Sequence, residues 1–279
     1  MSALIALFAL SIAALPAVLF LALTQRDTEL SDASLYRQFV AIFALTALGL
    51  YGLMQEPVVQ RQIDPAAQLA YDIENHPVLA ALVNHQSPSA ETIRNAVRTE
   101  LASGKRLSEA VRSVHPGLFR AGRERLAWAD AASALGWARA HREQLAWLQS
   151  RQVEACAALA VLQPEGIRAL SGGLEPALAT RFEASLIAVL ESAKRGLATP
   201  HSSDVSLEEM QTAYRGVSDT LAQRHGEALA RQLATPAGFQ SGDSGADAAT
   251  VCSARIDQLD AVLALSPALA ARIATNLLR

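Results

Sequence analysis

Two uncharged apolar runs constrain the fold of this chain more than any other feature. Ala3–Leu23 and Phe39–Met54 are separated only by the polar stretch Gln25–Gln38, QRDTELSDASLYRQ. An α-helix rises about 1.5 Å per residue, so the first run can cross a hydrocarbon core of about 30 Å. The second run is shorter and needs its polar flanks or a locally thinned bilayer. The sequence thus predicts a transmembrane hairpin with helices over 1–24 and 39–55 and a loop over 25–38.

A cleaved signal peptide is the alternative interpretation of the first run. Signal peptides carry basic residues before the apolar segment and a small-residue cleavage site after it, and neither is evident here. Within this run Ala9, Ala13 and Ala17 recur every four residues, a spacing that lets a second helix approach closely. We expect this face to pack against the second run, and dimerisation is the alternative.

Few charges determine the expected orientation of the hairpin. Lys and Arg near membrane spans favour the cytoplasmic side; the loop contains Arg26 and Arg37, whereas the residues just after Met54 offer only Arg61. We therefore expect a cytoplasmic loop and a large domain on the outer face. The corresponding location is the inner membrane of a Gram-negative bacterium, with the domain in the periplasm and lipid around the hairpin.

The composition predicts an all-α protein. Only 5% of the residues are aromatic, whereas the strong helix formers Ala, Leu, Arg, Glu and Gln are abundant. The formal net charge of -3 argues against a nucleic-acid partner, because phosphate contacts require a basic excess.

Helix-boundary signals recur after the hairpin. They comprise N-cap residues followed by proline, a capping box and helix-ending glycines. These signals are Asp64-Pro65, Ser87-Pro88, Ser266-Pro267, Ser206 with Glu209, Gly104 and Gly196.

One-sided apolar stripes accompany these boundaries and have the helical period. They are Ile93, Val97 and Leu101; Leu178, Phe182, Leu186 and Val189; Met210, Tyr214, Val217 and Leu221; Cys252, Ile256, Leu259 and Leu263; and Leu269, Ile273 and Leu277. They predict a bundle of about seven to nine helices. We expect the bundle over 56–234, a flexible loop over 235–247 and a docked C-terminal hairpin over 248–279.

The longest helical stretch is expected over Gly122–Leu162 and contains Trp128, Trp137 and Trp147. Three tryptophans suggest a ligand site, but large side chains also fill the gaps between small Ala side chains in a bundle core. We expect them to be core and rim anchors.

Two further groups of residues are candidates for function. Arg120, Arg123 and Arg125 form either a solvated face or a site for an anionic partner such as lipid head groups. Cys156 and Cys252 occupy apolar helix positions, where a free thiol behaves as a small hydrophobe. The alternative is a disulfide between them in the oxidising periplasm, worth about 4 to 5 kcal/mol in the chain-entropy account.

One segment resembles a known family. GKRLSEAVRSVHPGLF, Gly104–Phe119, is similar to the G-x-x-L-S-E-A turn of the inner-membrane platform proteins of type II secretion and type IV pilus systems. The resemblance covers this segment alone, without the second copy of the domain that the family has. It implies a cytoplasmic domain within a secretion or pilus assembly.

No catalytic motif is present in the sequence. A phosphate-binding loop, a dinucleotide-binding glycine pattern, a nucleophile elbow and a metal-ligand spacing of His, Cys and carboxylates are all missing. We expect no catalytic, cofactor-binding or metal-binding residues. The sequence thus predicts a membrane-anchored scaffold or accessory subunit that binds other proteins, and an enzyme with an unrecognised site is the alternative.

Overall fold

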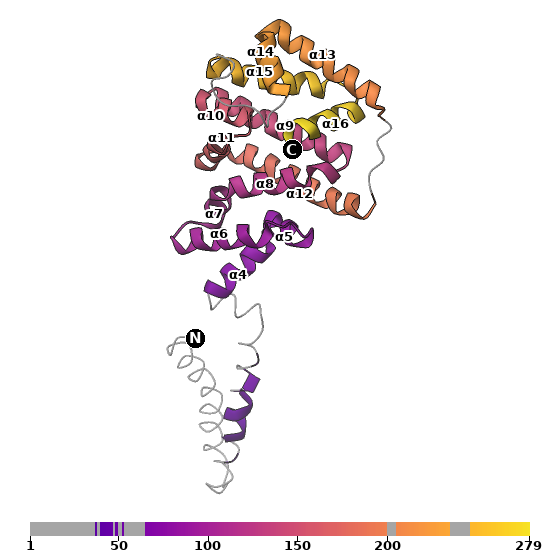
Figure 1. Cartoon of the computed structure of the whole chain (residues 1–279). Coiled ribbons are helices and arrows are strands. Elements are labelled where there is room, and N and C mark those ends of the chain that lie inside the picture. Colours follow the sequence, from indigo (N-terminus) through magenta and orange to yellow (C-terminus); the bar gives the residue numbers. More distant parts are fainter. Residues whose placement is uncertain are drawn as a thin grey trace. The chain divides into compact units, whose positions relative to one another are not determined.

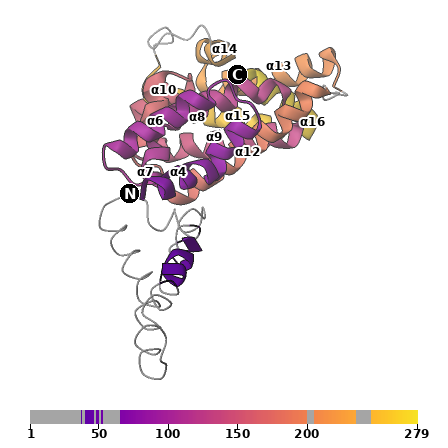
Figure 2. The same cartoon turned by 90° about the horizontal axis from the view of Figure 1, so that it is seen from below.

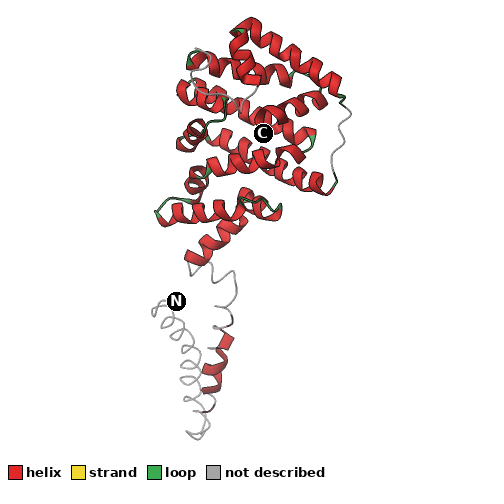
Figure 3. Ribbon diagram, viewed as in Figure 1, coloured by secondary structure: helices red, strands yellow, loops and turns green. Residues whose placement is uncertain are grey.

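The computed structural model describes residues 37, 40–46, 48–49, 52, 65–199, 205–234 and 246–279. These residues form helices and short connections and contain no strand (Figure 3). The predicted all-α class is therefore confirmed. The chain divides into two compact units, Met1–Glu74 and Asn75–Arg279.

The predicted hairpin falls largely outside the described residues. This is the case for the first run, with Ala9, Ala13 and Ala17, and for the loop except Arg37. The described residues of the second run are helical, and α4 (Pro65–Asn75) follows them. Within the part of the chain that the structure describes, no helix has both the length and the apolar character of a membrane span.

The second unit consists of many rather short helices (Figure 1). They are α5 (Pro77–Asn84), α6 (Ala90–Ala102), α7 (Leu107–Ser113), α8 (His115–Arg125), the 3₁₀ turn η1 (Leu126–Trp128), α9 (Ala131–Gln149), α10 (Val153–Ala160), α11 (Pro164–Ala169), the 3₁₀ turn η2 (Leu170–Gly172), α12 (Pro176–Ala198), α13 (Leu207–His225), α14 (Glu227–Ala234), α15 (Ala248–Leu263) and α16 (Pro267–Leu278). The expected number of seven to nine was too low, since this unit has twelve α-helices among its described residues.

The expected long helix over Gly122–Leu162 is wrong. The 3₁₀ turn η1 interrupts it, and Asp130 then starts α9 by accepting a hydrogen bond of 2.8 Å from the backbone N–H of Ser133. A second turn separates α9 from α10. The longest described helix is α12, with 23 residues.

Most boundary signals act where we expected them. Ser206 and Glu209 form the capping box at the start of α13, and Gly104 follows α6 with a φ of 92°. The Ser87-Pro88 signal lies slightly early, because α6 begins only at Ala90. Gly196 does not end a helix; it is buried inside α12, which continues to Ala198.

The core lies around α9, which packs against α10, α12, α15 and α16. The predicted stripe of α12 is fully buried, including Phe182 and Leu186. In contrast, the stripe of α13 is buried only at Val217 and Leu221, whereas Met210 and Tyr214 stay half-buried. The two views in Figures 1 and 2 place α13 and α16 at one side of this unit and α6 and α7 at the other. The amino-terminal half of α13 is thus a loosely covered edge.

Candidate functional site

Three segments that meet around α12 each carry one exposed apolar side chain. Val83 at the end of α5, Trp128 in η1 and Leu197 near the end of α12 are 44%, 39% and 47% exposed. We call this group the Trp128 surface. Since isolated exposed apolar residues are ordinary, its interest depends on whether the three segments meet.

Hydrogen bonds and ion pairs hold these segments together. The Nζ of Lys194 on α12 donates to the carbonyl of Asn84, which follows Val83, over 2.9 Å. The backbone N–H of Asp130, two residues after Trp128, donates to the Oγ of Ser192 over 2.7 Å. Arg195 lies 3.5 Å from the Asp130 carboxylate. The three apolar residues are therefore close in sequence to contacts that join α5, η1 and α12.

Charged groups border the same junction. Arg125 donates to the backbone carbonyl of Gln86. Partial burial lowers the pKa of His85, and the neighbouring Glu191 opposes this shift whereas Lys194 adds to it. Trp and Arg are among the residues that dominate binding at protein interfaces, and this junction contains the partly exposed Trp128 together with Arg125 and Arg195.

The structure divides the arginine cluster that the sequence suggested. Arg123 donates from Nε to the carbonyl of Leu278 over 3.0 Å and from Nη2 to the carbonyl of Arg279, which places a cation at the C-terminus of α16, where the helix dipole favours it. Partial burial, together with the neighbouring Arg120, lowers the pKa of Arg123. Arg125 is engaged with Gln86, so only Arg120 is exposed.

The three tryptophans occupy separate environments. Trp137 is 1% exposed, and its ring centroid lies 5.4 Å from that of Phe119 and 5.3 Å from that of Phe182. Trp147 stacks against the guanidinium of Arg151, with 4.9 Å between Cζ and the ring centroid. Trp137 is thus a core residue, and the three side chains do not form a common ligand site.

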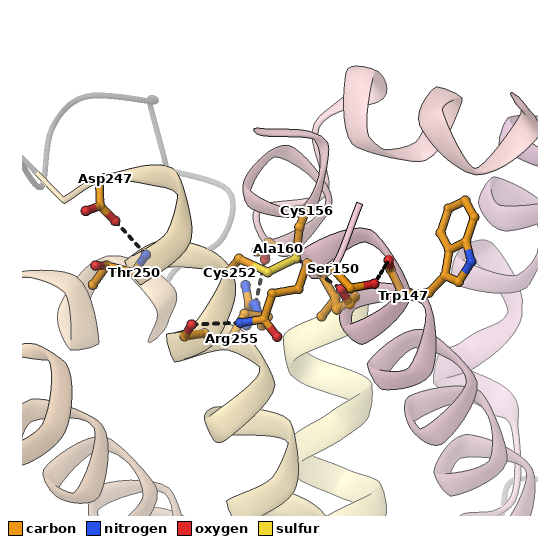
Figure 4. The surroundings of a disulfide bond; sticks show 11 residues. Trp147, Ser150, Cys156, Ala160, Asp247, Thr250, Cys252 and Arg255 are labelled. Atoms are coloured by element: carbon orange, nitrogen blue, oxygen red, sulfur yellow. Dashed lines mark hydrogen bonds between the residues drawn. A yellow bond between two sulfur atoms is a disulfide. The ribbon is translucent and has the colours of Figure 1, made fainter. Parts of the chain in front are cut away.

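The two cysteines are joined in the structure. Cys156 on α10 and Cys252 on α15 form a disulfide with a Cα–Cα distance of 5.4 Å (Figure 4). Both residues are fully buried. The bond connects two helices that are 96 residues apart in the sequence, so it restrains the unfolded chain over a long loop.

A buried arginine that the sequence analysis missed lies beside this disulfide. Arg255 is 0% exposed and donates to the carbonyls of Ala160 and Leu233 and to the Oε1 of Gln258. Burial lowers its pKa to about 10. Figure 4 shows the bond to Ala160 next to the disulfide.

No carboxylate is hydrogen-bonded to Arg255 among the described residues. Two of its acceptors are carbonyls at the C-terminal ends of α10 and α14, where the helix dipole concentrates partial negative charge. These two helix ends replace the missing counter-ion. Arg255 therefore holds α10, α14 and α15 together and acts structurally.

Two buried histidines form a second internal polar group. His115 and His141 are 5% and 1% exposed, and burial lowers the pKa of each to about 3. The neighbouring Arg255 and Arg123 lower that of His141 further, whereas Gln144 opposes the shift. The His115 ring packs 4.2 Å from that of Phe182. Both imidazoles are therefore neutral core groups near pH 7.

The described residues contain no group of three or more His, Cys, Asp or Glu side chains arranged to hold a metal ion. The segment that resembles secretion platform proteins, Gly104–Phe119, forms the turn after α6, then α7 and the start of α8.

The chain matches no protein-family model, and neither a curated protein nor a solved structure is significantly similar to it.

Proposed function

We propose that this chain is a membrane-anchored, non-enzymatic accessory subunit that binds another protein through its helical domain. The observation that carries the proposal is the Trp128 surface, where a 39% exposed Trp and two exposed aliphatic side chains belong to segments that hydrogen bonds and an ion pair join. Truncation of such aromatic anchors removes much of the affinity at protein interfaces. The two uncharged runs before residue 55 supply the anchor.

The cysteine geometry supports a location of this domain outside the cytosol. A disulfide is stable in an oxidising compartment, whereas most cytosols keep cysteine thiols reduced. Arg26 and Arg37 favour a cytoplasmic hairpin loop, and this orientation also puts the domain on the outer face of the membrane. Both arguments favour a periplasmic domain on a bacterial inner membrane.

Binding is tested by purifying the full chain in mild detergent together with its partners. We expect a partner that the unmodified chain retains to be lost from Trp128→Ala and from Val83→Glu, since these changes remove an anchor and add a charge at the same surface. Leu207→Ala is the control, because Leu207 is 66% exposed but lies on α13. Equal retention by all four proteins would contradict the proposal, provided that their melting temperatures agree.

Anchoring and orientation are tested separately. The chain should remain in the membrane fraction through an alkaline carbonate wash, because both apolar helices would lie in hydrocarbon. Alkaline phosphatase fused after Arg279 should be active if the domain is exported. A bright cytosolic fluorescent reporter at the same position would instead place the domain in the cytoplasm and strengthen the resemblance to secretion platform proteins.

A further inference from the structure

A pocket of about 470 Å³ opens between α13, the end of α14 and α16. It is lined by Met210, Gln211, Tyr214, Arg215, Ala234, Ile273, Asn276 and Leu277. Its volume lies within the range of about 300 to 1,000 Å³ that is usual for small-molecule sites. It is separate from the Trp128 surface, to which α5, η1 and α12 contribute.

The pocket exists because α13 covers α16 incompletely. Met210 and Tyr214 belong to a predicted core stripe, yet both remain half-buried. Tyr214 is held in place because its hydroxyl donates to the carbonyl of Ala234 over 2.8 Å. Ile273 and Leu277 of α16 also line the pocket, and because they are only 1% and 2% exposed they form its floor. Apolar walls thus face an open space that the chain's own helices do not fill.

The walls suit a flexible apolar ligand. The Met210 thioether can adapt its shape to different ligands, as methionines do at adaptable binding surfaces. The amide of Asn276 makes only a weak contact with the Met210 sulfur, 4.0 Å away. An alkyl chain that enters here would bury apolar surface, which is favourable, without breaking a strong hydrogen bond of Met210.

Positive charge at the rim selects the head group of the ligand. Arg215 is exposed, and its only hydrogen bond among the described residues runs from Nε to the carbonyl of Gln211 over a long 3.4 Å. No carboxylate in the described part of the chain forms an ion pair with Arg215. A second positive charge lies nearby, since partial burial raises the pKa of Tyr214 and the fully buried Arg255 opposes this shift. The terminal nitrogens of Arg215 are therefore available to an anion.

A neighbouring, more open pocket lacks this preference. It is lined by Ser206, Glu208, Glu209, Thr212, Ala213 and Leu269. Its two carboxylates would repel an anion. Of these two pockets, the one beside Arg215 combines apolar walls with a cationic rim.

We propose that the pocket between α13 and α16 binds a single-chain fatty carboxylate, with the alkyl chain against Met210, Tyr214, Ile273 and Leu277 and the carboxylate at Arg215. Charge complementarity and the apolar lining define this ligand class. The site adds a small-molecule ligand to the proposed protein-binding role, and it does not depend on that role.

The test uses the full chain in nanodiscs of zwitterionic lipid and a decanoate that carries a photoreactive diazirine. Empty nanodiscs correct for partition of the probe into the bilayer. After illumination, mass spectrometry should find the label on peptides that contain Met210–Arg215 or Ile273–Leu277. Unlabelled decanoate should compete, whereas decanol and decyltrimethylammonium should compete at least about threefold less, because a charged hydrogen bond contributes to the affinity.

Three variants make the outcome specific. Met210→Trp fills the pocket from its half-buried rim and should abolish labelling. Arg215→Gln should weaken decanoate binding about three- to tenfold and leave decanol unaffected. Arg272→Gln is the control, because Arg272 is exposed on α16 but does not line the pocket. Melting temperatures must match that of the unmodified chain. Labelling that survives Met210→Trp would overturn the site, and decanol competing as well as decanoate would overturn the ligand class.

Discussion

The ring of Trp137 lies directly against the bare Cα of Gly122. A Cβ added at residue 122 would clash with the Cη2 of that ring, so the backbone or the ring would have to move. The ring is itself fixed between Phe119 and Phe182. The contact thus ties α8 to α9 at the centre of the core.

Gly122→Ala should therefore destabilise the domain by about 1 to 3 kcal/mol, as overpacking of a dense core does. Gly136→Ala is the matched control, since it lies in α9 with no atom within 4 Å of its added Cβ. The control should be neutral or stabilising by up to about 1 kcal/mol through helix propensity. Urea unfolding of both variants measures the difference, and equal midpoints would show that residue 122 has room.

Arg255→Met should destabilise the domain although it removes a buried charge. Three acceptors would lose their donor at about 1 to 3 kcal/mol each. Burial of the charge, which lowers the pKa of Arg255 to about 10, offsets only part of this loss. A net loss of about 2 to 4 kcal/mol in the free energy of unfolding is expected. Arg272→Met on the exposed face of α16 should change it by less than about 0.5 kcal/mol; a stabilised Arg255→Met protein would contradict the account.

Loss of the disulfide should lower the free energy of unfolding, because the unfolded chain gains conformational entropy without the cross-link. The double variant Cys156→Ala, Cys252→Ala is expected to lose about 2 to 5 kcal/mol. A reductant present throughout the unfolding titration should lower the midpoint of the unmodified chain and leave that of the variant unchanged. If the reductant has no effect on either protein, the cysteines are not paired in solution.

Stability should decrease with acidity below about pH 6.5. The pKa of His115 and His141 is lowered from 6.5 to about 3 in the folded chain, so the unfolded chain binds more protons between these values. The stabilisation is therefore fully present above pH 6.5 and is lost as the pH falls towards 3. Each histidine contributes up to about 1.4 kcal/mol per pH unit in this window.

Removing one histidine should weaken the dependence of the free energy of unfolding on pH. His141→Leu is expected to reduce the slope of unfolding free energy against pH by up to about 1.4 kcal/mol per pH unit between pH 4 and 6. Gln144→Leu alters the same buried cluster without removing a titratable group, so the slope should stay unchanged. Denaturant titrations at several pH values measure both slopes, and a His141→Leu slope equal to that of the unmodified chain would be inconsistent with a buried neutral imidazole.

The sequence by itself determined the helical class, several boundaries and much of the core. The stripe containing Phe182 and Leu186 was predictable because residues three or four apart share one face of a helix. The capping box of Ser206 and Glu209 was predictable because its hydrogen bonds connect neighbouring residues. Such features depend on local geometry, which the order of residues encodes directly.

Tertiary structure alone decided the features that depend on which helices meet. Gly196 looked like a helix end but is buried within α12, and Arg255, which belongs to none of the predicted apolar stripes, is fully buried. Arg255 can be buried because Ala160 and Leu233, 95 and 22 residues away, bring two helix ends to it. Met210 and Tyr214 line a pocket instead of the core because α13 covers α16 incompletely. Helical periodicity shows which face is apolar, but only the packing partner determines whether that face is covered.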